Sequence, residues 1–398
     1  MIKIFHDGLI HNPPGGGSSI FKKEYVNYIF DYLPKKEVRL SVGTIPNSSP
    51  HFGTIITFSL AFSLAQRLEK LGKSVTVVVG LVDTGSLSTD RFILEDIEYQ
   101  KSLASTGKIN NYLADFEELL KKLSSYFGNL NYEIMNQGSL NLHQKALEII
   151  SKIINEKEKI GSLLFPETKR LGLRSACSQC GLADRYGLNN CYEDTRISFF
   201  CPRHDRYSID IQKDGLQRLE FETPLRNLIR GLLYTEDNQE KDVPYSWLRV
   251  TGSDHAGFYQ EQIFYKGAAL LGIDITNSPL IVYSPLVVDW AGVKLSKSIL
   301  VRGGYKYLID QGLEYLINYQ RFRKKFGDEG LRKLFKEVDL WLEEPSRLFR
   351  SYTIFYFAEL FKEEKVQKLE QSIPITSDIQ LEKELQEAQV EVFPKYDI

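Results

Sequence analysis

Residues 39–80 read RLSVGTIPNSSPHFGTIITFSLAFSLAQRLEKLGKSVTVVVG, and this stretch decides the fold. Its pattern predicts a strand, a tight turn, a helix and a second strand, which together form a βαβ unit. Two prolines and a glycine interrupt the turn, and apolar residues then recur at spacings of three and four. We expect the helix to begin near His51 and to end before Gly72, with a buried strand over residues 75–79.

The start of this helix is the first candidate functional site. Asn47, Ser48 and Ser49 offer side-chain oxygens to the first free N–H groups of the helix. A helix N-terminus attracts phosphate, to which His51 can donate a hydrogen bond, and Gly53 lets a flat ligand approach the backbone. The same residues are also compatible with an ordinary turn that contains a partly buried histidine.

A second candidate lies about 240 residues later, where the chain reads VKLSKS from Val293 to Ser298. Two ammonium groups on a loop of small residues suit a reaction that releases pyrophosphate, because they neutralise charge that grows in the transition state. Such a loop can close on a nucleotide and reopen for release. The alternative is a solvated basic surface turn.

Composition bounds the class of protein. A chain of 398 residues is long enough for two or three domains. Its 50 basic and 52 acidic side chains give a formal charge of −2, so any contact with RNA must be local. No apolar run has the length of a membrane span, and the N-terminus lacks the apolar core of a signal peptide. We therefore expect a cytoplasmic protein without a membrane or DNA partner.

The four cysteines lie close together in the sequence and predict a metal site. Cys177 and Cys180 form one pair, and Cys201 and His204 form a second pair after a spacer of twenty residues. Two such pairs are typical of a zinc ribbon or knuckle, in which four protein ligands close the shell and the metal is structural. A disulfide, or Cys191 in place of His204 as the fourth ligand, are the alternatives.

Asp83 follows the second predicted strand directly, at the sheet edge where ligands bind in open α/β folds. It is a candidate for contact with a substrate ammonium or hydroxyl group, and a turn or capping role is the alternative. From residue 91 to about residue 160 the pattern predicts mainly helices, among them one with apolar residues from Leu113 to Phe127. We interpret this range as a helical insertion between two halves of the sheet.

Four motifs occur in the order seen in class I lysyl-tRNA synthetases, and residues 39–300 resemble that family. They are Pro50-His-Phe-Gly-Thr54, Glu222-Thr-Pro-Leu-Arg226, Gly252-Ser-Asp-His255 and Lys294-Leu-Ser-Lys-Ser298, with the cysteine pairs before the second. Thr54 stands where the His-Ile-Gly-His signature has its second histidine, and only 100 residues follow Ser298. This remainder is shorter than the family's helical region that reads the anticodon.

The resemblance implies roles for particular residues. The catalytic residues would be His51, Thr54, Lys294 and Lys297, with ATP bound by Gly43, Pro50, Gly53, Gly252, Asp254, His255, Ser296 and Ser298. The amino acid would be bound by Asp83, Glu222 and Arg226. ATP and Mg²⁺ would take part in the reaction, and Zn²⁺ would be structural.

We therefore expect an α/β protein with a class I synthetase, Rossmann-type parallel sheet, helical and zinc-binding insertions and a short C-terminal helical domain. The expected boundaries are 1–90 and 216–300 for the two halves of the catalytic domain, 91–165 for the helical insertion, 166–215 for the zinc-binding insertion and 301–398 for the C-terminal domain.

The expected function is ATP-dependent activation of an amino acid, lysine or a related one, to an aminoacyl-adenylate. The acceptor would be tRNA, whose acceptor stem the basic and aromatic residues 321–326 can contact, or a small molecule or carrier. The competing hypothesis is a nucleotide- or RNA-binding protein that keeps the fold and has lost the chemistry, for which Thr54 is the main support.

Overall fold

The structure is a computed structural model that describes residues 24–295 and 306–362. Ser296, Lys297 and Ser298 of the Lys294–Ser298 motif lie outside the described residues. The chain divides into two units, residues 1–358 and 359–398, and the fold described below is that of the first unit.

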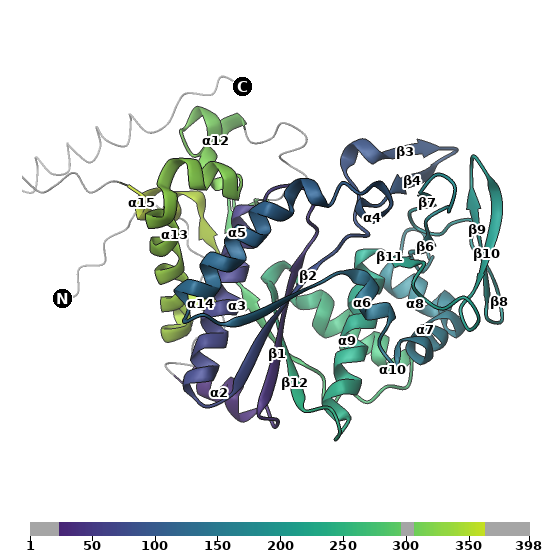
Figure 1. Ribbon diagram of the computed structural model, residues 1–398, viewed down its shortest axis with the longest axis horizontal. Helices are drawn as coiled ribbons and strands as arrows, with labels where there is room; N and C mark the ends of the chain where they lie inside the picture. The colour runs from purple at the N-terminus through teal and green to yellow at the C-terminus, as the bar shows by residue number, and fades with distance from the viewer. Residues whose placement is uncertain (1–23, 296–305, 363–398) are drawn as a thin grey trace, which may run out of the picture. The chain divides into compact units, whose positions relative to one another are not determined.

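A five-stranded parallel sheet forms the centre of this unit (Figure 1). Its strands are β1 (Glu37–Thr44), β2 (Ser74–Leu81), β5 (Asn131–Met135), β12 (Tyr245–Gly252) and β13 (Leu280–Ser284). They lie in the order β13-β12-β1-β2-β5, and every neighbouring pair is parallel. Numbered along the chain this is the order 5-4-1-2-3 of a doubly wound sheet, with its switch point between β1 and β12. The predicted α/β fold class is confirmed.

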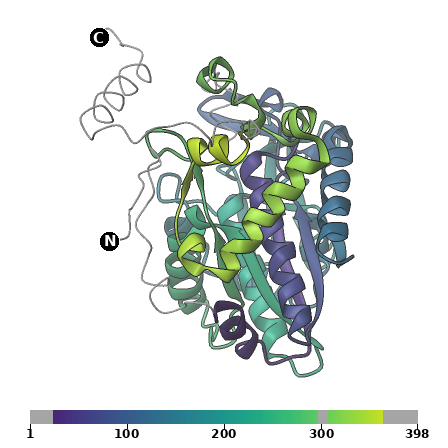
Figure 2. The same ribbon diagram turned by 90° about the vertical axis from the view of Figure 1, so that its left-hand side faces the viewer.

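Helices cover both faces of the sheet. One face is covered by α3 (Phe52–Lys70), against which α5 (Asn110–Tyr126) and α13 (Tyr319–Glu343) pack (Figure 2). On the other face α9 (Thr223–Gln239) contacts β12, and α7 (Ala146–Asn155) and the π-helix η3 (Phe258–Gly267) pack against α9. The sheet is therefore the middle layer of three.

The ends of α3 follow local sequence signals. At its C-terminus Leu71 is the cap and Gly72 has φ +100°. The Lys73 N–H donates to the Leu68 carbonyl (3.1 Å) and the Gly72 N–H to the Glu69 carbonyl (2.9 Å), which is the Schellman pattern. The N-terminus differs from the expectation: the cap comes from His51 itself and not from the three polar side chains before it.

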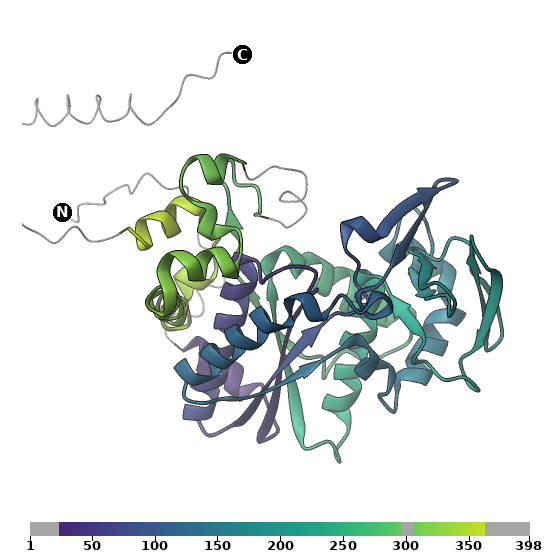
Figure 3. The ribbon, with the colours of Figure 1, turned by 45° about the horizontal axis from the view of Figure 1, so that its top comes forward.

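A peripheral region is inserted between the strands of the central sheet. It contains a sheet of β3 (Arg91–Leu94), β4 (Ile97–Lys101) and β7 (Leu182–Asp184), and another of β8 (Cys191–Glu193), β9 (Arg196–Cys201) and β10 (Asp205–Asp210). Two short strands, β6 (Leu173–Ser175) and β11 (Leu219–Phe221), pair with each other. Figure 3 shows the peripheral region, in blue and teal, to the right of the central sheet. The range 91–165, expected to be helical, thus also holds β3 and β4 and gives β5 to the central sheet.

The remaining elements are short. The helices are α2 (Tyr25–Asp31), α4 (Leu103–Thr106), α6 (Gln137–Asn141), α8 (Lys157–Leu164), α10 (Ala268–Leu270), α12 (Lys306–Asp310), α14 (Pro345–Leu348) and α15 (Ile354–Leu360), with single turns η1 (Ser88–Asp90), η2 (Ser253–His255) and η4 (Glu314–Leu316). The strands β14 (Val287–Val288) and β15 (Tyr352–Thr353) form a parallel pair. Within residues 24–295 and 306–362, none of the helices combines the length and apolar composition that a membrane span requires.

The long helix α13 is an integral part of the three-layer unit. Asp339 accepts hydrogen bonds from Ser63 (2.5 Å) and Arg67 (3.1 Å) of α3. The apolar side of α13 is buried, and Trp341 near its C-terminal end is 0% exposed and stacks on Tyr352. Residues 306–358 therefore pack with the sheet in one unit, whereas the expected domain boundaries stay predictions.

Candidate functional site

A pocket of about 170 Å³ lies at the switch point, between the C-terminal ends of β1 and β12. It is lined by Gly43, His51, Gly53, Thr54, Thr57, Phe58, Thr251, Gly252, Asp254, His255, Pro285, Leu286, Val287, Lys294 and Leu295. Eight of the residues assigned from the motifs are among them. The chain thus brings together segments that are more than 200 residues apart in sequence.

His51 has a defined role at the start of α3. Its backbone is extended (φ −65°, ψ 152°), and its Nδ1 accepts a hydrogen bond from the Gly53 N–H at 3.1 Å. Because an acceptor nitrogen carries no proton, the proton of a neutral ring is assigned to Nε2. The imidazole therefore caps the helix with one nitrogen and offers an N–H donor with the other.

The glycine at the end of β1 serves close strand packing. A Cβ at Gly43 would lie 2.7 Å from the carbonyl oxygen of Gly80 on β2, far inside van der Waals contact. Any larger residue would push these two strands apart beside the pocket. Gly43 thus lines the pocket, but the packing of the sheet is by itself a sufficient reason for a glycine here, and its role in binding ATP stays a prediction.

Asp254 and Lys294 join the two motifs that follow β12 and β13. The Lys294 Nζ lies 2.5 Å from an Asp254 carboxylate oxygen, and both side chains are partly exposed. A Cβ at Gly252 would lie 2.5 Å from the other Asp254 oxygen, so a larger residue at this position would displace the carboxylate. Burial lowers the pKa of neighbouring His255 from its usual value, although the Asp254 charge opposes this shift.

The loop that leads into the Pro50–Thr54 motif is held in place by the beginning of α13. The Tyr319 N–H donates to the Pro50 carbonyl (2.8 Å), and the Gln320 N–H donates to the Ser49 hydroxyl (3.3 Å). His51 and Asn318 also form an isolated antiparallel bridge. Pro50 itself lines a second, adjoining pocket that shares His51, Thr54 and Lys294 with the first. The motifs contain no signal for this contact. Asn318 marks the start of α13 as its N-cap, but this local signal does not say where the helix packs.

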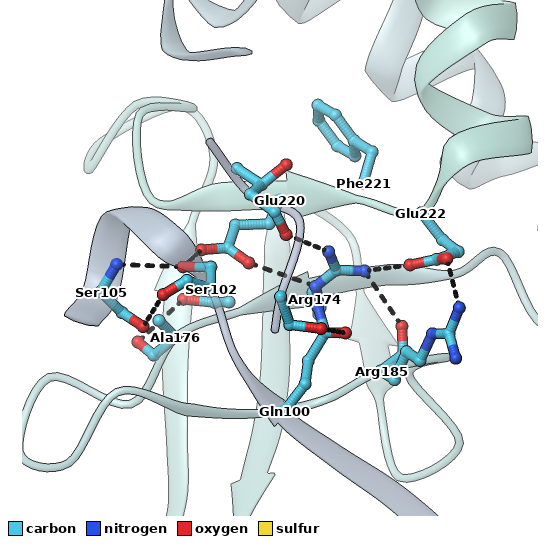
Figure 4. A network of polar contacts seen from close by, with 12 residues as sticks. Gln100, Ser102, Ser105, Arg174, Ala176, Arg185, Glu220, Phe221 and Glu222 are labelled. Atoms are coloured by element: carbon cyan, nitrogen blue, oxygen red, sulfur yellow. Dashed lines mark hydrogen bonds and ion pairs between the residues drawn. The ribbon is translucent and has the colours of Figure 1, made fainter. Parts of the chain in front are cut away.

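Glu222 lies in a buried network of charges (Figure 4). Its carboxylate accepts hydrogen bonds from Arg174 (2.8 Å) and Arg185 (2.9 Å). Arg174 also pairs with Glu220 (3.2 Å). Burial raises the pKa of Glu222, but the two guanidinium groups outweigh burial and hold it at about 2. Sequence reasoning missed Arg174 and Arg185, because nothing local marks them as partners of a residue 37 or more positions away.

The other two residues assigned to the amino acid lie near each other. Asp83 follows β2, is half-buried and accepts a hydrogen bond from the Gln137 N–H at 3.2 Å. Burial raises its pKa, while hydrogen bonds and the charge of Arg226 oppose this shift. Arg226, on the first turn of α9, is 5% exposed. The structure thus places one carboxylate and one guanidinium group beside the C-terminal ends of the strands.

Cys177, Cys180, Cys201 and His204 converge, with their potential ligand atoms all within 4.8 Å of one another. The Cys180 and Cys201 sulfurs are 3.5 Å apart, and the His204 Nδ1 lies 3.5 Å from Cys177 and 3.6 Å from Cys201. A tetrahedral zinc shell has edges of roughly 3.5–3.8 Å, so these residues fit the ion. All four cysteines are free, and Cys191 lies outside the cluster, with its sulfur 3.7 Å from Arg206.

The fold and the pocket define a doubly wound α/β protein with its candidate site at the switch point of the sheet. No protein-family model matches the chain, and a search of curated proteins found no match. The solved structures that are similar to it include three proteins described as aminoacyl-tRNA synthetases.

One is described as a provisionally assigned arginyl-tRNA synthetase from Campylobacter jejuni, with a TM-score of 0.35 and 12% sequence identity over 79% of this chain and 68% of that one. A tyrosyl-tRNA synthetase from Aeropyrum pernix has a TM-score of 0.34 and 10% identity over 78% of this chain and 85% of that one. A tyrosyl-tRNA synthetase from Archaeoglobus fulgidus, complexed with L-tyrosine, has a TM-score of 0.34 and 13% identity over 78% of this chain and 89% of that one. The likeness is too distant to assign an activity.

Proposed function

We propose that the pocket at the switch point binds MgATP and activates the carboxylate of an amino acid as an aminoacyl-adenylate. The observation that carries this proposal is the convergence of His51, Lys294 and Asp254 on one pocket at the C-terminal ends of β1 and β12. His51 can donate a hydrogen bond to a phosphate oxygen, the Lys294 ammonium group can balance phosphate charge, and the Asp254 carboxylate can accept the ribose hydroxyls. These are the three kinds of contact that recognise a nucleoside triphosphate.

The proposed reaction needs no general base. A carboxylate oxygen of the amino acid attacks the α-phosphorus, the bond from that phosphorus to the bridging oxygen breaks, and pyrophosphate leaves with the electron pair. An amino-acid carboxylate is already ionised at neutral pH, so no proton has to be removed. Catalysis then consists of positioning the reactants and stabilising charge.

Each residue has a part in this proposal. The Nε2–H of His51 donates to a phosphate oxygen at the start of α3, and Lys294 balances charge on the departing pyrophosphate. In the structure Lys294 is paired with Asp254, so binding of ATP would exchange this partner for a phosphate. Asp254 is then released to accept the ribose hydroxyls. Lys297, with Ser296 and Ser298, is proposed to complete the phosphate contacts from outside the described residues.

The amino acid and its acceptor belong to the proposal as well. Lysine is the substrate that the resemblance implies, and Asp83 is the candidate partner of its ammonium group because Glu222 is already paired with two arginines. The proposed acceptor is tRNA, with a small molecule or a carrier as the alternative. We also propose that Cys177, Cys180, Cys201 and His204 hold a structural zinc ion.

Pyrophosphate exchange into ATP, measured with each amino acid in turn, tests the reaction directly. Exchange that depends on a single amino acid supports adenylate formation. Absence of exchange with all of them, in protein that still binds ATP, would show that the pocket binds a nucleotide without this chemistry. That outcome favours the competing hypothesis of a nucleotide-binding protein.

A further inference from the structure

Three buried arginines lie behind the candidate ATP pocket. Arg226 and Arg230 are one turn apart on α9, and Arg249 lies on β12, the strand that α9 contacts. Their exposed fractions are 5%, 8% and 6%. Burial, and then the charge of Arg230, lower the pKa of Arg226 to about 9, and burial followed by the charge of Arg249 lowers the pKa of Arg230. The three residues thus form one cluster of like charge, named here the arginine cluster.

The arginine cluster is bonded to neutral groups only. Arg226 donates to the Phe221 carbonyl (3.2 Å) and the Thr223 hydroxyl (3.0 Å). Arg230 donates to the Asn227 amide oxygen (3.2 Å), and Arg249 donates to the Ser41 hydroxyl (3.0 Å). Among the described residues, no carboxylate forms an ion pair with any of the three, and the buried Nε atoms of Arg226 and Arg249 have no hydrogen-bond partner.

Arg174 shows how the same protein satisfies a buried arginine that has a structural role. It is 2% exposed and bonds two carboxylates, those of Glu220 and Glu222, as well as the Thr84 carbonyl (2.8 Å). Figure 4 shows Arg174 between these two glutamates. A buried charge without such partners destabilises the fold, and three of them together add mutual repulsion. The arginine cluster therefore lacks the carboxylate partners that the neighbouring network has. The aromatic ring of Tyr259, whose centroid is 5.4 Å from the Arg249 guanidinium carbon, offers a cation–π contact but no full negative charge.

Two carboxylates interact electrostatically with Arg226 but do not neutralise the arginine cluster. The charge of Glu222 raises the pKa of Arg226, but the two carboxylate oxygens of Glu222 are bonded to Arg174 and Arg185. Asp83 is also near Arg226, but it forms no ion pair there and burial raises its pKa. The region thus keeps an excess of positive charge that an anionic ligand would balance.

The arginine cluster is adjacent to the candidate ATP pocket. Ser41 on β1 and Arg249 on β12 are register partners, and two residues further along the same strands Gly43 and Thr251 line the pocket. Two residues of strand span about 7 Å. Arg230 also lines a separate small cavity with Ser41, Gly80 and Gln137, whose buried Nε2 is a further donor without a partner.

We propose that the arginine cluster binds a second carboxylate of the substrate, so that the protein activates an acidic amino acid. This inference rests on the proposed adenylate chemistry. The carboxylate that reacts must reach the α-phosphate in the pocket at the strand ends, whereas Arg249 lies two residues deeper on β12 and Arg230 lies on α9, the helix that contacts this strand. A dicarboxylic amino acid meets both requirements. The ammonium group of lysine would instead meet three like charges, so the arginine cluster disfavours the substrate that the sequence resemblance implies.

The first experiment uses the full-length wild-type protein in pyrophosphate exchange and in thermal unfolding without ATP. We expect exchange with L-glutamate or L-aspartate and a rise in Tm of several degrees with the same compound, because a ligand that binds only the folded state stabilises it. Exchange with lysine or a neutral amino acid alone would overturn this inference and leave the adenylate chemistry intact. No exchange with any amino acid, together with a Tm shift by an acidic one, would instead overturn the adenylate chemistry and keep the anion site.

The second experiment compares two substitutions of similar volume, Arg230→Met and Arg174→Met. Arg230→Met should raise KM for the acidic amino acid on the order of 10²-fold and leave Tm of the ligand-free protein unchanged or higher, because it removes an uncompensated charge. Arg174→Met should lower Tm by several degrees, because it leaves Glu220 and Glu222 unpaired. An equal loss of Tm in both variants would show that Arg230 is structural and would overturn the inference. The inference would also be overturned if inorganic phosphate raised the Tm of the wild type as much as the acidic amino acid does.

Discussion

His51 combines two roles that substitution can separate. Its Nδ1 caps α3 by accepting a hydrogen bond from the Gly53 N–H, and its Nε2–H is the proposed hydrogen-bond donor to a phosphate oxygen. His51→Ala should lower the free energy of unfolding by about 1 kcal/mol, because a helix cap is lost. It should also slow adenylate formation on the order of 10²–10³-fold, because one transition-state donor is lost. Urea denaturation and single-turnover kinetics measure the two effects.

His51→Asn is the matched control, because asparagine is a good N-cap but has no imidazole. We expect stability within a few tenths of a kcal/mol of the wild type and the same loss of rate as in His51→Ala. An asparagine variant with the wild-type rate would remove His51 from the chemistry and leave it as a cap only.

Glu222 should make stability depend on pH. Its folded pKa of about 2 is below the value of an unfolded glutamate, so its ion pairs stabilise the folded state above about pH 4.5. This contribution, about 3 kcal/mol, is lost as the pH falls from 4.5 toward 2. The difference in free energy of unfolding between wild type and Glu222→Gln, measured by denaturant titration, should therefore shrink over this range. A difference that stays constant from pH 6 to pH 3 would contradict the depressed pKa.

At the scale of elements, the proposed zinc site joins the turn after β6 to the turn between β9 and β10. We expect about one zinc per chain in the native protein and a marked loss of zinc and of Tm in Cys180→Ser, because a closed shell contributes folding energy. Elemental analysis and thermal unfolding measure both quantities. Cys191→Ser is the matched control, since Cys191 lies outside the cluster. Equal zinc content in both variants and the wild type would reject the site.

At the scale of the whole molecule, α13 connects the C-terminal region to the candidate site. It covers α3, and its first residues hold the Pro50–His51 loop. A chain that ends at residue 317 should therefore expose the apolar face of α3, lose cooperative unfolding and bind a hydrophobic dye, whereas a chain that ends at residue 362 should not. Denaturant titration and dye fluorescence check this. Cooperative unfolding of the shorter chain, with intact ATP binding, would show that α13 is dispensable.

The βαβ unit and the position of the Pro50–Thr54 motif could be predicted from the sequence alone. Periodicity, the glycine at position 72 and the histidine before α3 act within a few residues of one another, so local patterns are sufficient to predict them. The same holds for the two pairs of candidate metal ligands, since each pair lies on one tight turn. The motifs also selected His51, Asp254 and Lys294, which the fold brings to one pocket.

Which charged side chains form ion pairs with each other could be seen in the tertiary structure but could not be predicted from the sequence. Glu222 and Arg226 belong to one motif, but Glu222 is bonded to Arg174 and Arg185 while Arg226 has no carboxylate partner among the described residues. The contact of α13 with the signature loop was likewise not predicted. Ion pairs and hydrogen bonds depend on distances between remote segments, and the order of residues along a chain carries the chemical type of a group but not the neighbours that folding gives it.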